Sequence, residues 1–254
     1  MKLKDKIAII TGAARGIGAA FALGYAKEGA KLIIADISDG SDTVDAVVKA
    51  GSEAVFVRTD VTRQVQCDAM AKAALDHFGT VDILVNNAAL YGSIVKRPFL
   101  DITTEEWNRV MEVNTAGPFH CIKAVFPHMR KKGGKIINVA SSIVFEGAAG
   151  MPHYVASKGA VVAFTRCMAR ELGTYRINVN SLAPGYTHSE ASKEIQRNRQ
   201  DGGMDPEQIV IQRRCLKRSE NPEDLVGTAI FLASDMSDFI TGQLILCDGG
   251  CSFH

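Results

Sequence analysis

The chain has 254 residues, of which 46% are hydrophobic and 22% charged, and its formal net charge is +1. No long run of one charge sign occurs, so neither a nucleic acid nor a membrane surface is expected as a partner. Six scattered cysteines without a C-x-x-C pair argue against a metal site or a disulfide framework and for reduced thiols in the cytoplasm. No apolar run approaches the roughly 18 residues of a membrane-spanning helix.

Short apolar runs alternate with longer amphipathic segments along the chain. The predicted strands are Ile7–Thr11, Lys31–Ala35, Ala54–Thr59, Ile83–Asn86, Lys135–Val139, Ile177–Leu182 and Gln243–Cys247. The predicted helices are Gly16–Glu28, Gln64–Phe78, Thr104–Arg130, Tyr154–Leu172 and Pro222–Ser234. Strands that are almost continuously apolar are typical of a parallel sheet buried on both faces. The sequence therefore predicts an α/β, three-layer, doubly wound fold, a seven-stranded parallel sheet with helices on both faces, in one domain over residues 1–254.

The least regular part of the chain covers residues 187–218, which are rich in charge and include Gly202-Gly203. A long irregular segment inside a compact domain is usually a lid or a disordered loop, and we expect a substrate lid here. Its arginines are most simply a solvated charged face, with recognition of an anionic substrate as the alternative. They are Arg197, Arg199, Arg213 and Arg214.

A glycine pattern follows the first predicted strand and begins the first helix. Gly12, Gly16 and Gly18 have the spacing G-x-x-x-G-x-G, with Arg15 and Ile17 between them. Such a turn lets backbone approach a pyrophosphate, and a helix N-terminus offers free N–H groups and the positive end of a dipole. Taken alone, the pattern could be only a tight turn.

The second predicted strand is followed by Asp36, 18 residues after Gly18. A carboxylate there can accept hydrogen bonds from the adenosine ribose hydroxyls, and it repels a 2′-phosphate. Arg15 favours the opposite choice, because a guanidinium near the ribose can pair with that phosphate. Ile37 supplies no second positive charge, and the sequence therefore predicts NAD, with NADP as the less favoured cofactor.

Tyr154 and Lys158 are four residues apart on a predicted helix, so their side chains share one face with their bases about 5–6 Å apart. An ammonium about 4 Å from a phenolate is worth roughly 4 kcal/mol at an effective dielectric near 20. We expect this to bring the Tyr154 pKa from about 10 toward neutrality, where a phenol can exchange a proton with an alcohol or carbonyl. A surface Tyr–Lys pair is the simpler explanation unless a cofactor site lies beside it.

Together these motifs resemble the short-chain dehydrogenase/reductase family, in its single-domain branch, and imply a Rossmann fold. The resemblance extends from Thr11 to Gly250. Four further motifs follow in the family's order: Asp60-Val61, Asn86–Ala89, Asn114–Gly117 and Pro184–Thr187. Ala89 stands where glycine is usual in the family.

The resemblance implies a catalytic tetrad. Tyr154 would be the general acid/base, and Ser141 would hold the substrate oxygen. Lys158 would lower the tyrosine pKa and bind the nicotinamide ribose, and Asn114 would hold a water that relays protons. Ser142 is the nearest rival to Ser141, but the family's spacing of 13 residues before Tyr154 favours Ser141. Asn114 is equally explained as a helix-bending or capping residue.

The resemblance also implies the residues that contact cofactor and substrate. The cofactor residues are Gly12, Arg15, Gly16, Ile17, Gly18, Asp36, Asp60, Val61, Asn87, Ala88, Tyr154, Lys158, Pro184, Gly185 and Thr187. The substrate residues are Ser141, Ile143, His153 and Tyr186, with His153 as a wall or packing residue rather than a base. No metal is implied.

The expected pocket walls are largely apolar or aromatic, which suits a secondary alcohol with a hydrophobic or aromatic substituent. The pattern, with its ending Asp248–His254, is similar to family members that oxidise 1-phenylethanol or pyridoxal. Three alternatives stay open: an NADPH-dependent 3-oxoacyl-type reductase, a dehydrogenase of an anionic or sugar-derived alcohol, and a non-catalytic dinucleotide-binding regulator. Two long predicted helices carry apolar residues on more than one face, and since relatives often assemble through them, we expect a homotetramer.

Overall fold

The computed structural model describes residues 1–197 and 205–253; Arg199, Gly202, Gly203 and His254 lie outside the described residues. Within them, parallel strands form one seven-stranded sheet in the order β3-β2-β1-β4-β5-β6-β7. The strands are β1 Ile7–Thr11, β2 Lys31–Asp36, β3 Ala54–Arg58, β4 Ile83–Asn86, β5 Gly134–Val139, β6 Ile177–Pro184 and β7 Leu244–Cys247. The predicted doubly wound parallel sheet is confirmed, with strand ends that differ from the prediction by at most two residues.

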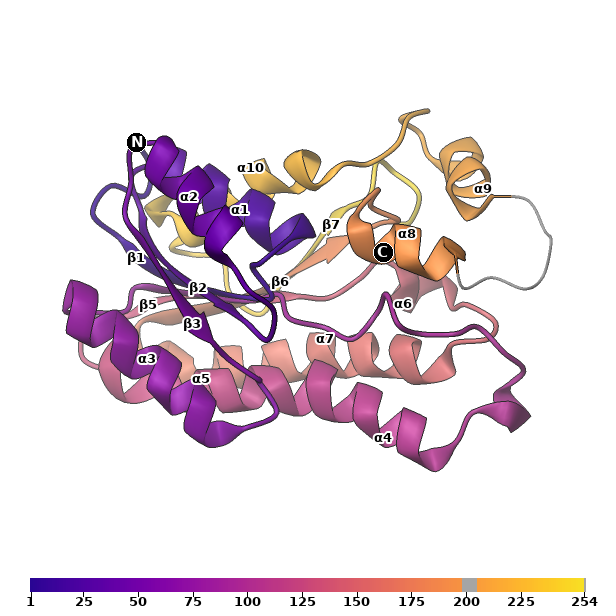
Figure 1. Cartoon of the computed structure of the whole chain (residues 1–254), viewed down its shortest axis with the longest axis horizontal. Coiled ribbons are helices and arrows are strands. Elements are labelled where there is room, and N and C mark those ends of the chain that lie inside the picture. The colour runs from indigo at the N-terminus through magenta and orange to yellow at the C-terminus, as the bar shows by residue number, and fades with distance from the viewer. Residues whose placement is uncertain (198–204, 254) are drawn as a thin grey trace.

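Helices cover both faces of the sheet (Figure 1). One face carries α1 Gly16–Lys27, α2 Ser41–Lys49 and α10 Pro222–Ala233. The other face carries α3 Gln64–Phe78, α4 Thr104–Met111, α5 Gly117–Met129 and α7 Pro152–Leu172. The remaining helices, α6 Ile143–Glu146, α8 Glu190–Arg197 and α9 Pro206–Arg213, lie beyond the ends of the strands. No helix in the described ranges is long and apolar enough to cross a membrane.

The period-two geometry of the strands explains the two cores. In β1, Ala8 and Ile10 pack into the core beneath α1 and α10, whereas Ile7 and Ile9 pack into the core beneath α3 and α5. Because successive side chains of a strand point to opposite faces, a strand covered on both sides must be apolar at every position. The uninterrupted isoleucine and alanine run of β1 is the sequence signature of that double burial.

Several helical segments differ from the prediction. The predicted helix Thr104–Arg130 contains a π-helical turn, Glu112–Ala116, between α4 and α5. The short helix α2 was not predicted, because it has only nine residues and buries only Thr43 and Val47. The expected lid is less irregular than its composition indicated, since α8 and α9 form within it.

The strand order reverses between β1 and β4, which lead to opposite halves of the sheet. Loops that leave the carboxyl ends of these strands diverge, and the crevice between them is where ligands bind in open α/β sheets. The topology alone therefore places the site beyond the ends of β1 and β4.

Candidate active site

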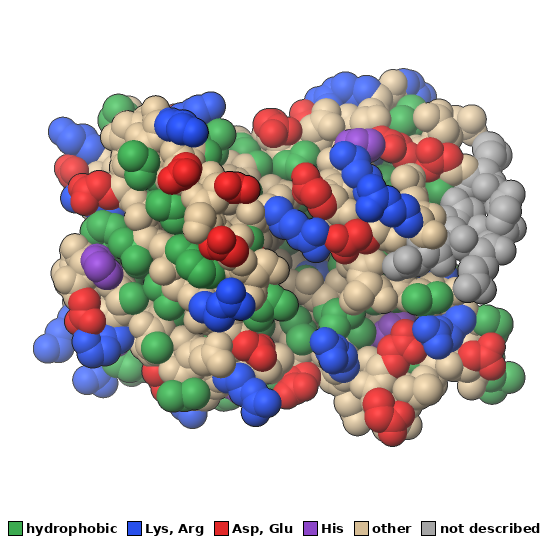
Figure 2. All heavy atoms as spheres, in the orientation of Figure 1, with side chains coloured by type: hydrophobic (Ala, Val, Ile, Leu, Met, Phe, Trp, Pro, Cys, Tyr) green, Lys and Arg blue, Asp and Glu red, His purple; other side chains and the backbone are tan. Residues whose placement is uncertain are grey.

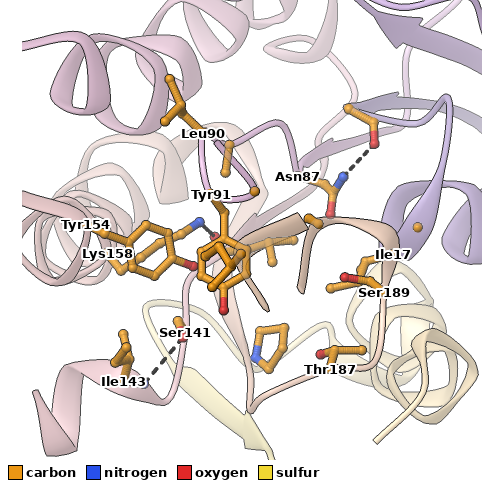
Figure 3. Close-up of a pocket in the computed structure, with 18 of the residues that line it drawn as sticks. Ile17, Asn87, Leu90, Tyr91, Ser141, Ile143, Tyr154, Lys158, Thr187 and Ser189 are labelled. Carbon is orange, nitrogen blue, oxygen red and sulfur yellow. Dashed lines mark hydrogen bonds between the residues drawn. The ribbon is translucent and has the colours of Figure 1, made fainter. Parts of the chain in front are cut away.

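A cavity of about 790 Å³ lies at this position. Its walls come from the segments that follow β1, β2, β4, β5 and β6, from α8 and α9, and from Cys251 near the end of the chain. Figure 2 shows the molecular surface hollowed here. Figure 3 shows two groups of labelled side chains, with Asn87, Ile17 and Thr187 on one side and Tyr154, Tyr91 and Ser141 on the other.

The glycine turn has a conformation that requires glycine. Gly12 and Gly16 have φ values of +63° and +61°, a region that side chains with a Cβ rarely adopt. A Cβ on Gly18 would lie 2.3 Å from the Gly12 carbonyl oxygen, and one on Gly12 would lie 2.7 Å from the Ala88 Cα. Asn87 Nδ2 donates to the Thr11 and Gly12 carbonyl oxygens at 3.0 and 2.9 Å. The turn is thus a backbone cradle at the N-terminus of α1, which fits a dinucleotide pyrophosphate.

Asp36 is held in place by backbone donors at the end of β2. The Ala14 N–H donates to its Oδ2 and the Ser38 N–H to its Oδ1, each at 2.9 Å. The carboxylate lines the cavity beside the glycine turn. Arg15 also lines the cavity, but its Nη1 lies 2.7 Å from Glu194 Oε1 on α8. The predicted ribose-binding carboxylate is therefore oriented, and the competing guanidinium is engaged elsewhere.

The other predicted cofactor residues fall into two groups. Gly18 packs under the turn and is not part of the wall, whereas the rest of the set lines the cavity. The wall residues in this second group are Gly12, Gly16, Ile17, Asp60, Val61, Asn87, Ala88, Pro184, Gly185 and Thr187. Thr187 Oγ1 donates to Glu220 Oε1 at 2.6 Å, which fixes the segment after β6. Asp60 Oδ1 accepts from the Thr62 N–H and hydroxyl at 3.0 and 2.8 Å.

Ser141, Tyr154 and Lys158 meet on the opposite wall. Ser141 lies beside the Tyr154 hydroxyl and counteracts the rise of its pKa, and Lys158 Nζ lies 5.9 Å from the centroid of the Tyr154 ring. Nζ donates to the Val139 carbonyl oxygen at 2.7 Å. These residues come from the end of β5 and from α7, which packs against β6. An acid/base side chain, a polar partner and an ammonium thus stand in the same cavity as the glycine turn.

Burial changes the protonation of this group. Desolvation raises the pKa of Tyr154 above its ordinary value, and the neighbouring Ser141 hydroxyl offsets this only in part. Burial also lowers the pKa of Lys158 to about 8. The expectation that Lys158 brings the Tyr154 pKa toward neutrality is therefore wrong for the free protein. The ammonium lies over the ring and donates to a carbonyl, and burial disfavours both charged forms.

Asn114 lies in the π-helical turn and is only 1% exposed. Its Oδ1 accepts from the Leu90 N–H at 2.7 Å, and its Nδ2 donates to Ser157 Oγ at 3.0 Å. The side chain therefore ties the loop after β4 to α7, and it does not form part of the cavity wall. This loop carries Tyr91, whose ring centroid lies 5.0 Å from that of Tyr154. Asn114 positions a wall of the site, while its role in a water relay stays a prediction.

Among the predicted substrate residues, Ser141, Ile143 and Tyr186 line the cavity. His153 does not, and its prediction as a pocket residue is wrong. It is completely buried, with its Nε2 3.6 Å from Glu106 Oε1, and burial lowers its pKa. Adjacent residues on a helix point in different directions, so the neighbour of Tyr154 faces α4 instead.

The lid arginines have different environments. Arg214 is not a solvated residue: it is 1% exposed, and its Nη2 lies 3.1 Å from Glu220 Oε2. Arg213 lines the cavity and pairs with Glu146 Oε2 at 2.6 Å, whereas Arg197 is exposed. Glu146 was not identified from the sequence, because a lone glutamate in a one-turn helix carries no pattern. Its only signal was its position five residues after Ser141.

No group of three histidine, cysteine, aspartate or glutamate side chains in the described part of the chain is arranged to hold a metal ion. The doubly wound sheet, the glycine cradle at its switch point and the Ser–Tyr–Lys group beside it define a dinucleotide-binding protein of the Rossmann class.

Comparisons with known proteins agree with this class. A family model described as enoyl-(acyl carrier protein) reductase matches residues 12–252. Galactitol 2-dehydrogenase of Agrobacterium fabrum is 42% identical over 256 residues, which cover 98% of each chain. The 2-dehydro-3-deoxy-D-gluconate 5-dehydrogenase of Escherichia coli is 34% identical over 250 residues, covering 98% of this chain and 96% of its own. The crystal structure of a short chain dehydrogenase from Mycobacterium paratuberculosis bound to NAD has a TM-score of 0.89 at 30% identity, and 99% of each chain is covered.

The chain belongs to the short-chain dehydrogenase/reductase family, as its motifs indicated. It is an oxidoreductase that acts on CH–OH donors with a nicotinamide cofactor.

Proposed function

We propose that this enzyme transfers hydride reversibly between NAD and a secondary alcohol that carries further hydroxyl groups, such as an acyclic sugar alcohol. The observation that supports the reaction best is the placement of Ser141, Tyr154 and Lys158 in one cavity with the glycine cradle. One domain, residues 1–254 with a lid at 187–218, would carry both the cofactor and the substrate.

In the proposed reaction, the bound nicotinamide supplies the hydride acceptor and, when oxidised, a positive charge in the cavity. Ser141 donates a hydrogen bond to the substrate oxygen and directs it to the Tyr154 hydroxyl. Tyr154 as phenolate removes the hydroxyl proton while hydride leaves the carbinol carbon. In the reverse direction the protonated phenol, which burial favours in the free protein, gives its proton to the carbonyl oxygen of the substrate as hydride adds to the carbonyl carbon. Tyr91 and Ile143 exclude water from this group.

NAD is the proposed cofactor. The two backbone hydrogen bonds on Asp36 and the ion pair of Arg15 with Glu194 support it, because a fixed carboxylate accepts ribose hydroxyls and repels a 2′-phosphate. An NADPH-dependent reductase is the alternative. Steady-state kinetics with both cofactors tests the choice: a higher kcat/KM with NADP than with NAD would contradict the proposal.

The polar end of the cavity supports a substrate with several hydroxyls. Glu146 Oε2 lies 2.6 Å from Arg213 Nη2, and Ser252 Oγ donates to Glu146 Oε1 at 2.6 Å. A charge-balanced pair offers donors and acceptors without net charge, which suits a neutral polyol better than a sugar acid. The name of one relative, galactitol 2-dehydrogenase, favours the same class, whereas that of another, 2-dehydro-3-deoxy-D-gluconate 5-dehydrogenase, names a sugar acid and favours the alternative of an anionic substrate.

A small aromatic or hydrophobic secondary alcohol is the second candidate. It is favoured by the apolar surface that Tyr91, Ile143 and Met151 present beside Tyr154. A panel of hexitols, a hexonate and 1-phenylethanol with NAD, followed by the absorbance of reduced nicotinamide, separates the two. The polyol proposal fails if 1-phenylethanol has the highest kcat/KM.

A Glu146→Gln variant sharpens this test. We expect the KM for the best hexitol to rise about tenfold with little change in kcat, because a hydrogen bond to a charged group is worth about 1.5–3 kcal/mol. The kinetics with 1-phenylethanol, which has no distal hydroxyl, should stay within about twofold of the unmodified enzyme. An equal effect on both substrates would mean that Glu146 only supports the wall.

We also propose a homotetramer in the cytoplasm. Trp107 on α4 and Phe119 on α5 are 38% and 47% exposed, and large apolar side chains on neighbouring helices support a protein contact. The six free cysteines are compatible with a reducing compartment. Sedimentation velocity tests the assembly, and a stable monomer at micromolar concentration would exclude it.

A further inference from the structure

The ion pair between Arg15 and Glu194 joins the cofactor turn to the lid. Arg15 is the residue immediately before α1, and Glu194 lies on α8. Their side chains are 58% and 35% exposed, and both line the cavity. Figure 1 shows α8 beside the start of α1. The pair therefore connects two elements that are remote in the sequence across one wall of the cavity.

Arg15 is also close to the carboxylate that selects the ribose. The N–H of Ala14, its neighbour, donates to Asp36 Oδ2 at 2.9 Å. A guanidinium within reach of this point would pair with a ribose 2′-phosphate in a charge-assisted hydrogen bond. Arg58 does not fill that role, because its Nη1 donates to the Ile37 carbonyl oxygen at 2.7 Å and it lies outside the cavity wall.

We propose that Glu194 is a determinant of cofactor specificity. By pairing with Arg15 it holds the guanidinium toward the lid, and it leaves the Asp36 carboxylate to face the ribose alone. The specificity for NAD is then set from two places, one fixed by the sheet and the other carried by the lid. This inference rests on the proposed function in that a nicotinamide dinucleotide occupies the cavity.

Glu190 provides a matched control on the same helix. Its Oε2 lies 3.3 Å from the position that a Cβ on Gly16 would take, so it carries the same charge near the same turn. The described ion pair of Arg15 is with Glu194 and not with Glu190. Removing the Glu190 charge should affect all anionic ligands of the turn alike, whereas removing the Glu194 charge should affect the 2′-phosphate specifically.

The experiment measures binding rather than turnover. Titration calorimetry gives the dissociation constants of 5′-AMP and adenosine 2′,5′-bisphosphate, which differ only in the 2′-phosphate. In Glu194→Gln we expect the affinity for the bisphosphate to rise about tenfold relative to 5′-AMP. Glu190→Gln should leave this ratio unchanged. The double variant Arg15→Gln/Glu194→Gln should return the ratio to that of the unmodified enzyme.

The single variant Arg15→Gln gives a second, independent test. Because Glu194 already holds the guanidinium away from the ribose, this variant should leave the ratio of bisphosphate affinity to 5′-AMP affinity unchanged. A fall in bisphosphate affinity in Arg15→Gln would show that Arg15 is free to reach the ribose, and would overturn the proposal.

The Glu194→Gln result is equally decisive. An unchanged ratio, alongside a rise in Asp36→Ser, would overturn the role of Glu194 and leave the proposed function intact. Absence of binding of either nucleotide and of NAD to the unmodified enzyme would overturn both.

Discussion

The two sides of the cavity are built in different ways. On the cofactor side, backbone groups and short polar side chains fix the site through hydrogen bonds close to the strand ends, as with Asn87 on the glycine turn. On the side formed by α8, α9 and the residues that follow α9, three ion pairs join side chains: Arg15–Glu194, Arg213–Glu146 and Arg214–Glu220. The cofactor side thus depends on hydrogen bonds to backbone groups at the strand ends, while the other side depends on pairs of charged side chains. The glycine turn itself could be identified from neighbouring residues, but Asn87, which binds it, lies about 75 residues away in the sequence.

The largest expected effect is the loss of catalysis when the Tyr154 hydroxyl is removed. Tyr154→Phe should lower kcat/KM for alcohol oxidation by about 10²–10⁴-fold, the usual contribution of general acid/base catalysis, with a much smaller change in NAD affinity. Tyr91→Phe removes a hydroxyl from the adjacent ring and serves as the control, with an expected loss below tenfold. If Tyr154→Phe keeps activity near that of the unmodified enzyme, Tyr154 is not the general acid/base.

The next largest effect is expected at the buried ion pair between Arg214 and Glu220. Arg214→Met leaves the buried Glu220 carboxylate without its cation, which should lower the free energy of unfolding in urea by about 3–5 kcal/mol. Arg213→Met, at an exposed pair one residue earlier, should cost about 1 kcal/mol or less. Burial raises the pKa of Glu220 to about 7, so the loss in Arg214→Met should shrink below that pH. Equal losses of unfolding free energy in the two variants would contradict the expected difference between the buried and the exposed ion pair.

Lys158 makes stability depend on pH. Its pKa is about 8 in the folded protein and 10.5 ordinarily, so between these values the unfolded chain binds more protons. The free energy of unfolding should therefore rise with pH in this window, by roughly 3 kcal/mol, and the penalty is complete below pH 8. Lys158→Met removes the titrating group, and subtracting its urea profile isolates this contribution. A flat difference between the two profiles from pH 8 to 10.5 would show that Lys158 is not desolvated.

The smallest of these effects tests the cofactor side. Gly18→Ala places a methyl group 2.3 Å from the Gly12 carbonyl oxygen, and we expect a loss of about 1–3 kcal/mol in unfolding free energy together with weaker NAD binding in calorimetry. Gly173→Ala is the control, because a Cβ there meets nothing within 4 Å. Unchanged NAD affinity in Gly18→Ala would mean that the cradle tolerates a shift of its backbone.

The sheet and the cofactor turn could be predicted because their signals are local. An apolar run such as Ile7–Thr11 has to be buried on both faces, and glycines with positive φ follow it directly. The reactive group was also found, since Tyr154 and Lys158 have helical spacing and the family supplied Ser141.

The predictions that failed share a physical cause. Each depends on how deeply a side chain is buried or on partners that are remote in the sequence. The spacing of Tyr154 and Lys158 does not reveal that both are desolvated, and so the direction of the Tyr154 pKa was wrong. His153 precedes Tyr154 on the same helix but faces Glu106 on α4. The helices α8 and α9 are eight residues each and rich in charge, and their partners on other elements cannot be inferred from such short patterns.

The unequal burial of the three ion pairs has a consequence for how the protein responds to ionic strength. Dissolved salt screens charges that touch water over distances of about 10 Å at 0.1 M, so it weakens the contacts of Arg15 and Arg213 while the enclosed Arg214 is sheltered. Rising salt should therefore weaken the contacts that α8 and the end of α9 make through Glu194 and Arg213, while the Arg214–Glu220 contact persists. The ionic strength of the buffer would then alter the cavity wall that these helices form.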